Sequence, residues 1–265
     1  MLISDLRPTV DYPISLHLLG HPKIYLNGLR VDSGIPVQSL LLLSLLVTRK
    51  GEGTNRDEAA FILWPDLAES EARASLRRQL YNLQRVFATS ELAPLRCTAK
   101  ALRWDPNSEA WADITEFERL IQSPHMFEAA ANLYSGDFAP YVDHEWAGNL
   151  REQLRRKLRC VLEELLQRSC SRGNIAQALE YAERLLREDP WREDVVRQFM
   201  LLRFRTGDRA GALAYYRRFC ERLRSEFEVE PMPETLECHD IIVRGLPVAK
   251  FLFEQGLGRA DRWLA

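Results

Sequence analysis

The chain has 265 residues, of which 46% are hydrophobic and 28% charged, which is typical of a globular protein long enough for two modest domains. Its 36 Lys and Arg residues nearly balance its 38 Asp and Glu residues, and the formal net charge is -2. This balance excludes a globally basic surface, so any nucleic-acid binding has to be local. The charge is uneven, since residues 1–108 carry a net charge of +2 and residues 109–265 a net charge of -4.

Membrane and metal-binding classes find little support in the sequence. The apolar run Ser39–Val47 is about half as long as a membrane span, and acids and prolines in residues 1–13 argue against a signal peptide. Five cysteines at irregular spacings favour reduced thiols in the cytoplasm over a disulfide framework. Cys238 and His239 are adjacent but too few for a zinc site. We therefore expect no metal, no cofactor and no membrane partner.

The first predicted elements follow an N-terminal extension over residues 1–13. Two alternating segments, Ile14–Gly20 and Lys23–Val31, predict a small antiparallel sheet, and the second contains the hairpin-type dipeptide Asn27-Gly28. The next run, residues 37–50, is apolar on nearly all sides and is followed by Gly51. This pattern predicts a buried helix with a glycine at its C-terminal end.

Three more elements complete the first predicted domain. A second helix is expected over residues 55–64, with Thr54 or Asn55 as its N-cap and Pro65 as its stop. A third, Glu69–Phe87, contains neither Gly nor Pro, and Leu95–Trp104 predicts two strands around a turn. The order of sheet, three helices and hairpin predicts a winged helix-turn-helix of the OmpR type over residues 14–106, in which the third helix enters the DNA major groove.

The third predicted helix is the candidate for DNA recognition. Spacings of four, three and four residues put a core stripe on one side of it, formed by Leu76, Leu80, Leu83 and Phe87. The opposite side and its flanks carry side chains that can contact bases or phosphates, and the candidates are Arg73, Ser75, Arg77, Arg78, Tyr81, Asn82 and Arg85. The alternative is a solvated amphipathic helix, which has the same pattern.

Phosphate contacts are expected on both sides of this helix. Lys100 and Arg103 lie on the predicted hairpin, the wing, where contacts position a protein on DNA without reading its sequence. Thr54 and Arg56 lie at the predicted start of the second helix, and a helix N-terminus is a natural anion site.

From about Trp111 the sequence is almost entirely helical and contains an internal repeat. The stretch "RGNIAQALEYAERLL" from Arg172 aligns with "TGDRAGALAYYRRFC" from Thr206 at an offset of 34 residues. This is the period of the tetratricopeptide repeat, in which Gly lies at the turn and Ala where helices approach closely. We predict a helical repeat domain over residues 107–245, followed by a C-terminal tail over residues 246–265. The whole chain is thus predicted to be mainly α, with an α+β winged helix at its start.

These motifs also carry a resemblance to a known family. Four stretches of the chain resemble the winged helix and linker of the Streptomyces antibiotic regulatory protein family. They are "LLGHPKIYLNGLRV", "TNRDEAAFILWPD", "EARASLRRQLYNLQRVF" and "LRWDPNSEAWADITEFERL". Four later stretches resemble the bacterial transcriptional activator domain of that family. They are "LYSGDFAPY", "ERLLREDPWREDVVRQFMLL", "GDRAGALAYYRRF" and "FEVEPMPETLE". The resemblance implies a winged helix that binds direct repeats at promoters, a helical domain that dimerises, and recruitment of RNA polymerase.

The family pattern is not followed everywhere. Gln84 precedes Arg85 where the family often ends its DNA helix with Arg-Leu-Arg. The sequence has no GxxxxGK[ST] phosphate loop, so the chain resembles the two-module members that lack an NTPase module. Two other classes stay open. One is a repeat-based interaction adaptor whose winged helix does not bind DNA. The other is an enzyme, for which the only acidic-His cluster is Asp137, Asp143, His144 and Glu145, which we interpret as a loop.

Overall fold

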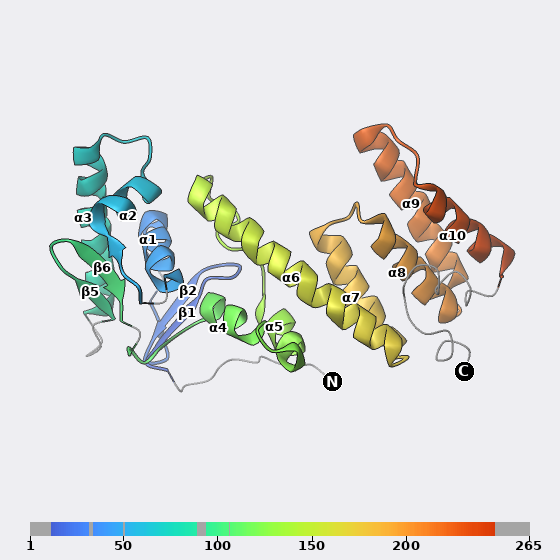
Figure 1. Cartoon of the computed structure of the whole chain (residues 1–265), viewed down its shortest axis with the longest axis horizontal. Helices are drawn as coiled ribbons and strands as arrows, with labels where there is room; N and C mark the ends of the chain where they lie inside the picture. The colour runs from blue at the N-terminus through green and yellow to red at the C-terminus, as the bar shows by residue number, and fades with distance from the viewer. Residues whose placement is uncertain (1–11, 32–33, 50, 89–93, 106, 247–265) are drawn as a thin grey trace. The chain divides into compact units, whose positions relative to one another are not determined.

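The computed structural model describes residues 12–31, 34–49, 51–88, 94–105 and 107–246 (Figure 1). Its chain divides into two compact units, Met1–Arg155 and Arg156–Ala265. Most of the predicted N-terminal extension and of the predicted C-terminal tail lies outside the described residues.

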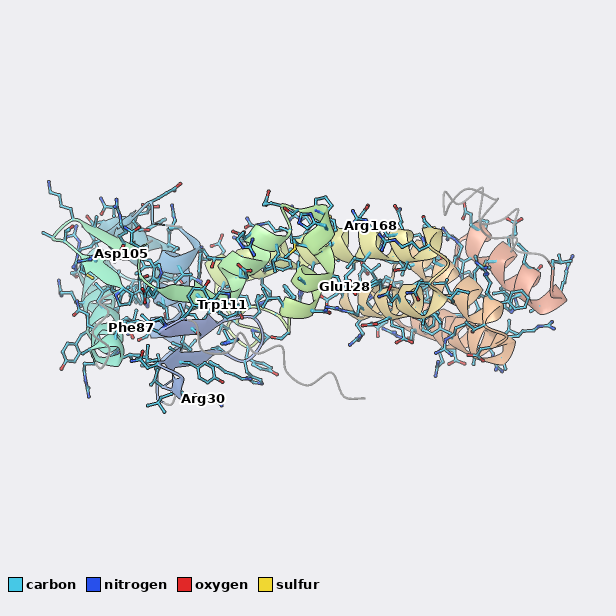
Figure 2. All side chains as sticks on the ribbon, turned by 90° about the horizontal axis from the view of Figure 1, so that it is seen from below. Arg30, Phe87, Asp105, Trp111, Glu128 and Arg168 are labelled. Carbon is cyan, nitrogen blue, oxygen red and sulfur yellow. The ribbon has the colours of Figure 1, made fainter. Side chains whose placement is uncertain are left out.

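The first unit begins with a small four-stranded sheet in the order β3-β2-β1-β7. Its strands are β1 (Ile14–His17), β2 (Lys23–Leu26), β3 (Leu29–Arg30) and β7 (Ala110–Ala112). The predicted antiparallel pair is confirmed by β1 and β2, with Ile14 opposite Leu26. The sequence did not predict β7, which pairs parallel to β1. Figure 2 shows Arg30 and Trp111 on the two edge strands of this sheet.

Three helices follow the hairpin of this sheet, namely α1 (Val37–Thr48), α2 (Arg56–Leu63) and α3 (Glu69–Phe87). Helix α1 is buried along most of its length, as its apolar sequence predicts. Asn55 is the N-cap of α2, because its side chain accepts a hydrogen bond from the backbone N–H of Asp57 at 2.9 Å. Helices α1 and α3 are joined by a buried hydrogen bond, in which the Ser39 hydroxyl donates to Gln79 Oε1 at 2.8 Å.

The wing is a second, three-stranded sheet in the order β4-β6-β5. It consists of β4 (Thr54–Asn55), β5 (Leu95–Cys97) and β6 (Ala101–Trp104), and β5 and β6 form the predicted hairpin. The Thr98 hydroxyl closes the turn between them by accepting a hydrogen bond from the Ala101 N–H at 3.0 Å. The rings of Phe87 and Trp104 meet edge to face at 5.8 Å, so the wing packs against the end of α3 (Figure 1).

The elements after the wing also belong to the first unit. Strand β7 leads into α4 (Asp113–Leu120), which a short 3-10 helix (Pro124–Met126) connects to α5 (Phe127–Leu133). The buried Asp113 carboxylate accepts hydrogen bonds from the backbone N–H groups of Leu18 and Leu19 at 2.8 and 2.9 Å, which ties α4 to the end of β1. The division between compact units therefore falls at residues 155 and 156, whereas the predicted domain boundary fell at residues 106 and 107.

The second unit is helical. It contains the second part of α6 (Glu145–Ser171), followed by α7 (Ile175–Glu188), α8 (Glu193–Arg205), α9 (Arg209–Phe227) and α10 (Pro233–Arg244). Helix α8 packs against α7, α9 and α10, and α10 also packs against α9 (Figure 1).

Equivalent positions in this unit repeat the same local geometry 34 residues apart. Gly173 and Gly207 lie at the turns before α7 and α9 with φ angles of +73° and +82°, a region that glycine adopts without strain. Asn174 and Asp208 follow them as N-caps, each accepting a hydrogen bond from the backbone N–H three residues later. The predicted helical repeat is confirmed.

Candidate nucleic-acid interface

Helix α3 has one buried side and one exposed side. The predicted core stripe is confirmed, because Leu76, Leu80, Leu83 and Phe87 are at most 4% exposed. Acidic residues stand in its first turn and Arg85 in its last, the arrangement that the helix dipole favours. The side chains that face solvent include Ala74, Arg77, Arg78, Tyr81, Gln84 and Arg85.

Three arginines on the exposed side of α3 lack an acidic partner. Among the described residues, no Asp or Glu lies within ion-pair distance of Arg77, Arg78 or Arg85. The Arg85 guanidinium lies 5.9 Å from the centre of the Tyr81 ring, at the outer limit of a cation–π contact. Tyr81 is itself 60% exposed. The exposed side of α3 therefore combines unneutralised positive charge with an aromatic ring.

Arg73 differs from the other three arginines. Its Nε donates to Asp57 Oδ1 at 2.7 Å, and its Nη2 lies 2.6 Å from Glu69 Oε1. The hydrogen bond from Arg73 holds the pKa of Asp57 below its usual value, and the same bond raises the pKa of Arg73. The pair links the first turn of α2 to the N-terminal part of α3.

The structure corrects the placement of two predicted site residues. Ser75 is buried at 9% exposure, because the helical turn of 100° per residue places it beside the core residue Gln79. Thr54 is also buried, at 1% exposure, because it pairs with Leu102 inside the wing sheet. Neither hydroxyl is available to DNA. Asn82 is half-buried and donates from its amide to Gln79 Oε1 at 3.2 Å.

The wing presents the basic residues that the sequence placed there. Lys100 and Arg103 are exposed, and neither forms an ion pair within the described residues. Arg56 is half-buried, and its Nε donates to the carbonyl oxygen of Thr98 at 2.8 Å. Its backbone N–H donates to the carbonyl of Lys100 at 3.1 Å. Arg56 therefore holds the wing turn beside the start of α2.

The sequence did not indicate the part that Asp57 plays at this surface. Asp57 was not among the predicted site residues, because its contact with Arg73 depends on how α2 packs against α3. Gln84, noted only as a departure from the family pattern, lies on the exposed side with the arginines.

The other candidate clusters have structural roles. Arg155 pairs with Asp137, and His144 Nε2 lies 3.0 Å from the Leu63 carbonyl oxygen. Cys238 is buried against the Arg197 carbonyl. Within the ranges that the structure describes, no group of three or more His, Cys, Asp or Glu could hold a metal ion. In the same ranges no helix is long and apolar enough to cross a membrane.

Comparison with known families assigns the helical region. The model of the bacterial transcriptional activator domain matches residues 109–243, just over half of the chain. The chain therefore belongs to the bacterial transcriptional activator domain family, a class of transcriptional regulators, and the predicted relation to the Streptomyces antibiotic regulatory proteins is confirmed. The match begins two residues after the predicted domain boundary.

Relatives that match most of this chain carry regulatory names. The chain is 26% identical over 240 residues to the regulatory protein AfsR of Streptomyces coelicolor, covering 87% of this chain and 24% of AfsR. It is 23% identical over 275 residues to the transcriptional regulatory protein MoaR1 of Mycobacterium tuberculosis, covering 97% of this chain and 88% of MoaR1. The chain thus spans about a quarter of AfsR and most of MoaR1.

A solved structure shares the fold. Mycobacterium tuberculosis EmbR, in complex with a low-affinity phosphopeptide, superimposes with a TM-score of 0.65 at 20% sequence identity. The match covers 89% of this chain and 66% of the EmbR chain. At this identity the similarity supports the fold alone, namely a small N-terminal sheet region followed by helical repeats.

Proposed function

We propose that the chain is a sequence-specific DNA-binding transcriptional regulator that uses the exposed side of α3 to read the major groove. The observation that carries this proposal is the set of three arginines without acidic partners, Arg77, Arg78 and Arg85, on a helix whose other side is core. Guanidinium groups pair with guanine edges and with phosphates. The bound molecule is double-stranded promoter DNA, and the protein works in the cytoplasm where that DNA lies.

The wing supplies the contacts that position the protein. Lys100 and Arg103 stand on an exposed hairpin that packs against the end of α3, so a duplex held by α3 lies within reach of their flexible side chains. Ammonium and guanidinium groups there contact phosphates and set the register on the duplex without reading bases.

The helical region supports the second half of the function. Its family is named for transcriptional activation, and relatives over most of their length are named transcriptional regulators. We infer that this region activates transcription by contact with RNA polymerase. Transcription in vitro, with purified polymerase and a template that carries the selected DNA site, tests this. Addition of the protein should increase the transcript, and a decrease would make the protein a repressor.

The end of the helical region offers a surface for self-association. Leu236 and Val243, which are 44% and 42% exposed, lie seven residues apart and form an apolar stripe on one face of α10, and the exposed Met232 and Leu246 flank the two ends of the helix. The adjoining side of α10, which includes Cys238, packs into the core. Helix α10 has Glu234 in its first turn and Arg244 in its last, so an antiparallel second copy would bring opposite charges together across the stripe. We propose a homodimer through α10, which would hold two winged helices together and raise the effective concentration of the second at a neighbouring DNA site.

Sedimentation at increasing concentration tests the dimer. The double variant Leu236→Glu and Val243→Glu should remain monomeric where the parent chain dimerises. Leu29→Glu is the matched control, because Leu29 is exposed in β3, and it should leave association unchanged. A parent chain that stays monomeric at all concentrations would remove the dimer from the proposal.

The DNA-binding proposal is tested by selection from a pool of random duplexes, followed by binding of the selected duplex at several salt concentrations. We expect one enriched sequence and an affinity that falls steeply with salt, because phosphate contacts release counterions. A chain that enriches no sequence and binds without salt dependence would instead be an interaction adaptor built on its helical repeats.

A further inference from the structure

One of the four arginines of α3 is held by acids of the same surface. The Nε and Nη2 groups of Arg73 contact Asp57 and Glu69, which stand in the first turns of α2 and α3. A guanidinium has five N–H donors in one plane, so two contacts along one edge leave the Nη1 group and the outer edge for another molecule. The two acids also fix the plane in which those donors lie.

The local charge decides what that molecule can be. Arg73, Asp57 and Glu69 together carry a net charge of -1. A phosphate at the outer edge of the guanidinium would therefore add a third negative group to a site that is already negative. A guanine edge presents two acceptors, O6 and N7, and carries no formal charge. Arg77, Arg78 and Arg85 have no such acids, and their positive charge is open to phosphates as well as to bases.

We propose that Arg73 contacts the edge of a guanine, and that Asp57 and Glu69 are the positioning residues that hold its guanidinium for that contact. This inference rests on the proposed binding of DNA through α3. It assigns specificity at one base pair to an arginine held by acids, in addition to the base and phosphate contacts of the arginines that lack them.

The neighbouring residue on α2 provides a matched control. Glu58 is adjacent to Asp57 in the first turn of α2, and it pairs with Arg49 at 2.8 Å instead of with an arginine of α3. Asp57→Asn and Glu58→Gln therefore remove the same charge from the same helical turn. Only Asp57→Asn removes one of the two ion pairs that hold the guanidinium of Arg73.

The experiment selects duplexes from a random pool with the full chain and with Asp57→Asn, Glu58→Gln and Arg73→Ala, and then measures affinity for the selected duplex and its single-base variants. For Arg73→Ala we expect the preference for one guanine to fall roughly five- to 150-fold, the discrimination of one well-placed bidentate contact. For Asp57→Asn the preference at the same position should fall in part, while affinity for unrelated duplexes stays equal or rises. Glu58→Gln should keep the preference.

Two results would overturn the inference, and they are distinguishable. If Arg73→Ala weakens binding to all duplexes alike, and Asp57→Asn behaves as Glu58→Gln does, Arg73 contacts phosphate and only the inference fails. If the parent chain enriches no sequence at all, the proposed DNA binding fails and the inference fails with it. Circular dichroism of each variant, with an unchanged unfolding temperature, shows that the comparison concerns binding and not folding.

Discussion

Helices α3 and α9 are both 19 residues long and rich in arginine, but they use that arginine differently. In α9, three of the five arginines contact neighbouring groups: Arg209 donates to the Val243 carbonyl, Arg222 lies 5.0 Å from the centre of the Trp191 ring, and Arg224 pairs with Glu230 at 2.6 Å, whereas Arg217 and Arg218 are exposed. In α3, only one of four arginines is held by an acid. The number of arginines on a helix therefore says little about function, whereas their partners within the fold say a good deal.

The same comparison shows what each unit does with its exposed surface. The α3 side of the first unit keeps positive charge open to solvent next to a basic wing. In the second unit, three of the five arginines of α9 contact neighbouring residues, and the exposed apolar stripe lies on α10. This difference supports a division of work between DNA contact in the first unit and protein contact in the second.

The largest expected effect on DNA affinity comes from replacing arginines of α3 that have no acidic partner. The double variant Arg78→Ala and Arg85→Ala should lose about 1–3 kcal/mol of specific DNA affinity for each arginine that pairs with a base. The matched control is Arg217→Ala with Arg218→Ala, two exposed arginines of α9, which should bind the selected duplex as the parent chain does. Fluorescence anisotropy measures the DNA affinity of both variants. Equal losses of affinity would show that the arginines of α3 contribute no more to DNA binding than those of α9.

A second effect concerns the buried carboxylate that joins α4 to β1. Burial raises the pKa of Asp113 to about 6 from 3.8, so folding favours its protonated form. The stability that this preference gives is complete below about pH 4 and is lost as the pH rises through 6. The free energy of unfolding of the parent, minus that of Asp113→Asn, should therefore fall by about 2 kcal/mol between pH 4 and pH 7.

Urea unfolding at both pH values measures this difference, and Asp105 provides the control of opposite sign. The hydrogen bond from the Asn107 backbone, followed by that from Arg96, lowers the pKa of Asp105. The difference between the parent and Asp105→Asn should therefore stay nearly constant between pH 7 and pH 4 and fall only as the pH is lowered below about 4. A difference for Asp113→Asn that does not change with pH would show that this carboxyl group titrates normally.

The two repeat turns should respond alike to substitution. Gly173→Ala and Gly207→Ala should each destabilise the second unit by about 1–2 kcal/mol, because both residues have positive φ angles that alanine adopts only with strain. Each added methyl group would meet open space, so no steric clash contributes. Thermal unfolding checks this, and Gly148→Ala, within α6 and also next to open space, should not destabilise the chain. A loss of stability in only one of the two variants would show that the two repeat turns are not equivalent.

The smallest effect is expected from the wing. Lys100→Ala with Arg103→Ala should weaken binding to every duplex by a similar factor, and the slope of log affinity against log salt should decrease by about one for each phosphate that the variant no longer neutralises. Arg96→Ala is the control, since Arg96 is an exposed wing residue already paired with Asp105 at 2.9 Å. A change in the selected sequence would show that the wing reads bases.

Much of this architecture follows from local sequence. The bounds of α3 were predicted because no Gly or Pro interrupts residues 69–87 and because a four-three-four spacing defines its core side. The repeat was predicted because each turn needs a glycine and each close approach an alanine, such as the fully buried Ala178 and Ala212. These features depend on neighbours within one or two helical turns.

What the sequence did not predict depends on distant contacts. Strand β7 has only three residues, and its pairing with β1 joins segments almost 100 residues apart. Ser75 was assigned to the exposed side because it lies at the edge of the helical wheel, where the packing of neighbouring elements decides burial. The ion pair between Asp57 and Arg73 likewise exists only because α2 packs on α3.

The most direct test of the central claim is a photo-crosslink from the exposed side of α3. A photoreactive phenylalanine analogue replaces Tyr81 of α3 in one variant and Phe227 of α9 in another, since these aromatic residues are 60% and 53% exposed. After irradiation with the selected duplex, the Tyr81 variant should crosslink to bases of the selected sequence and the Phe227 variant should not. A protein that still binds the duplex, yet crosslinks from Phe227 and not from Tyr81, would contradict the assignment of α3 as the helix that reads DNA.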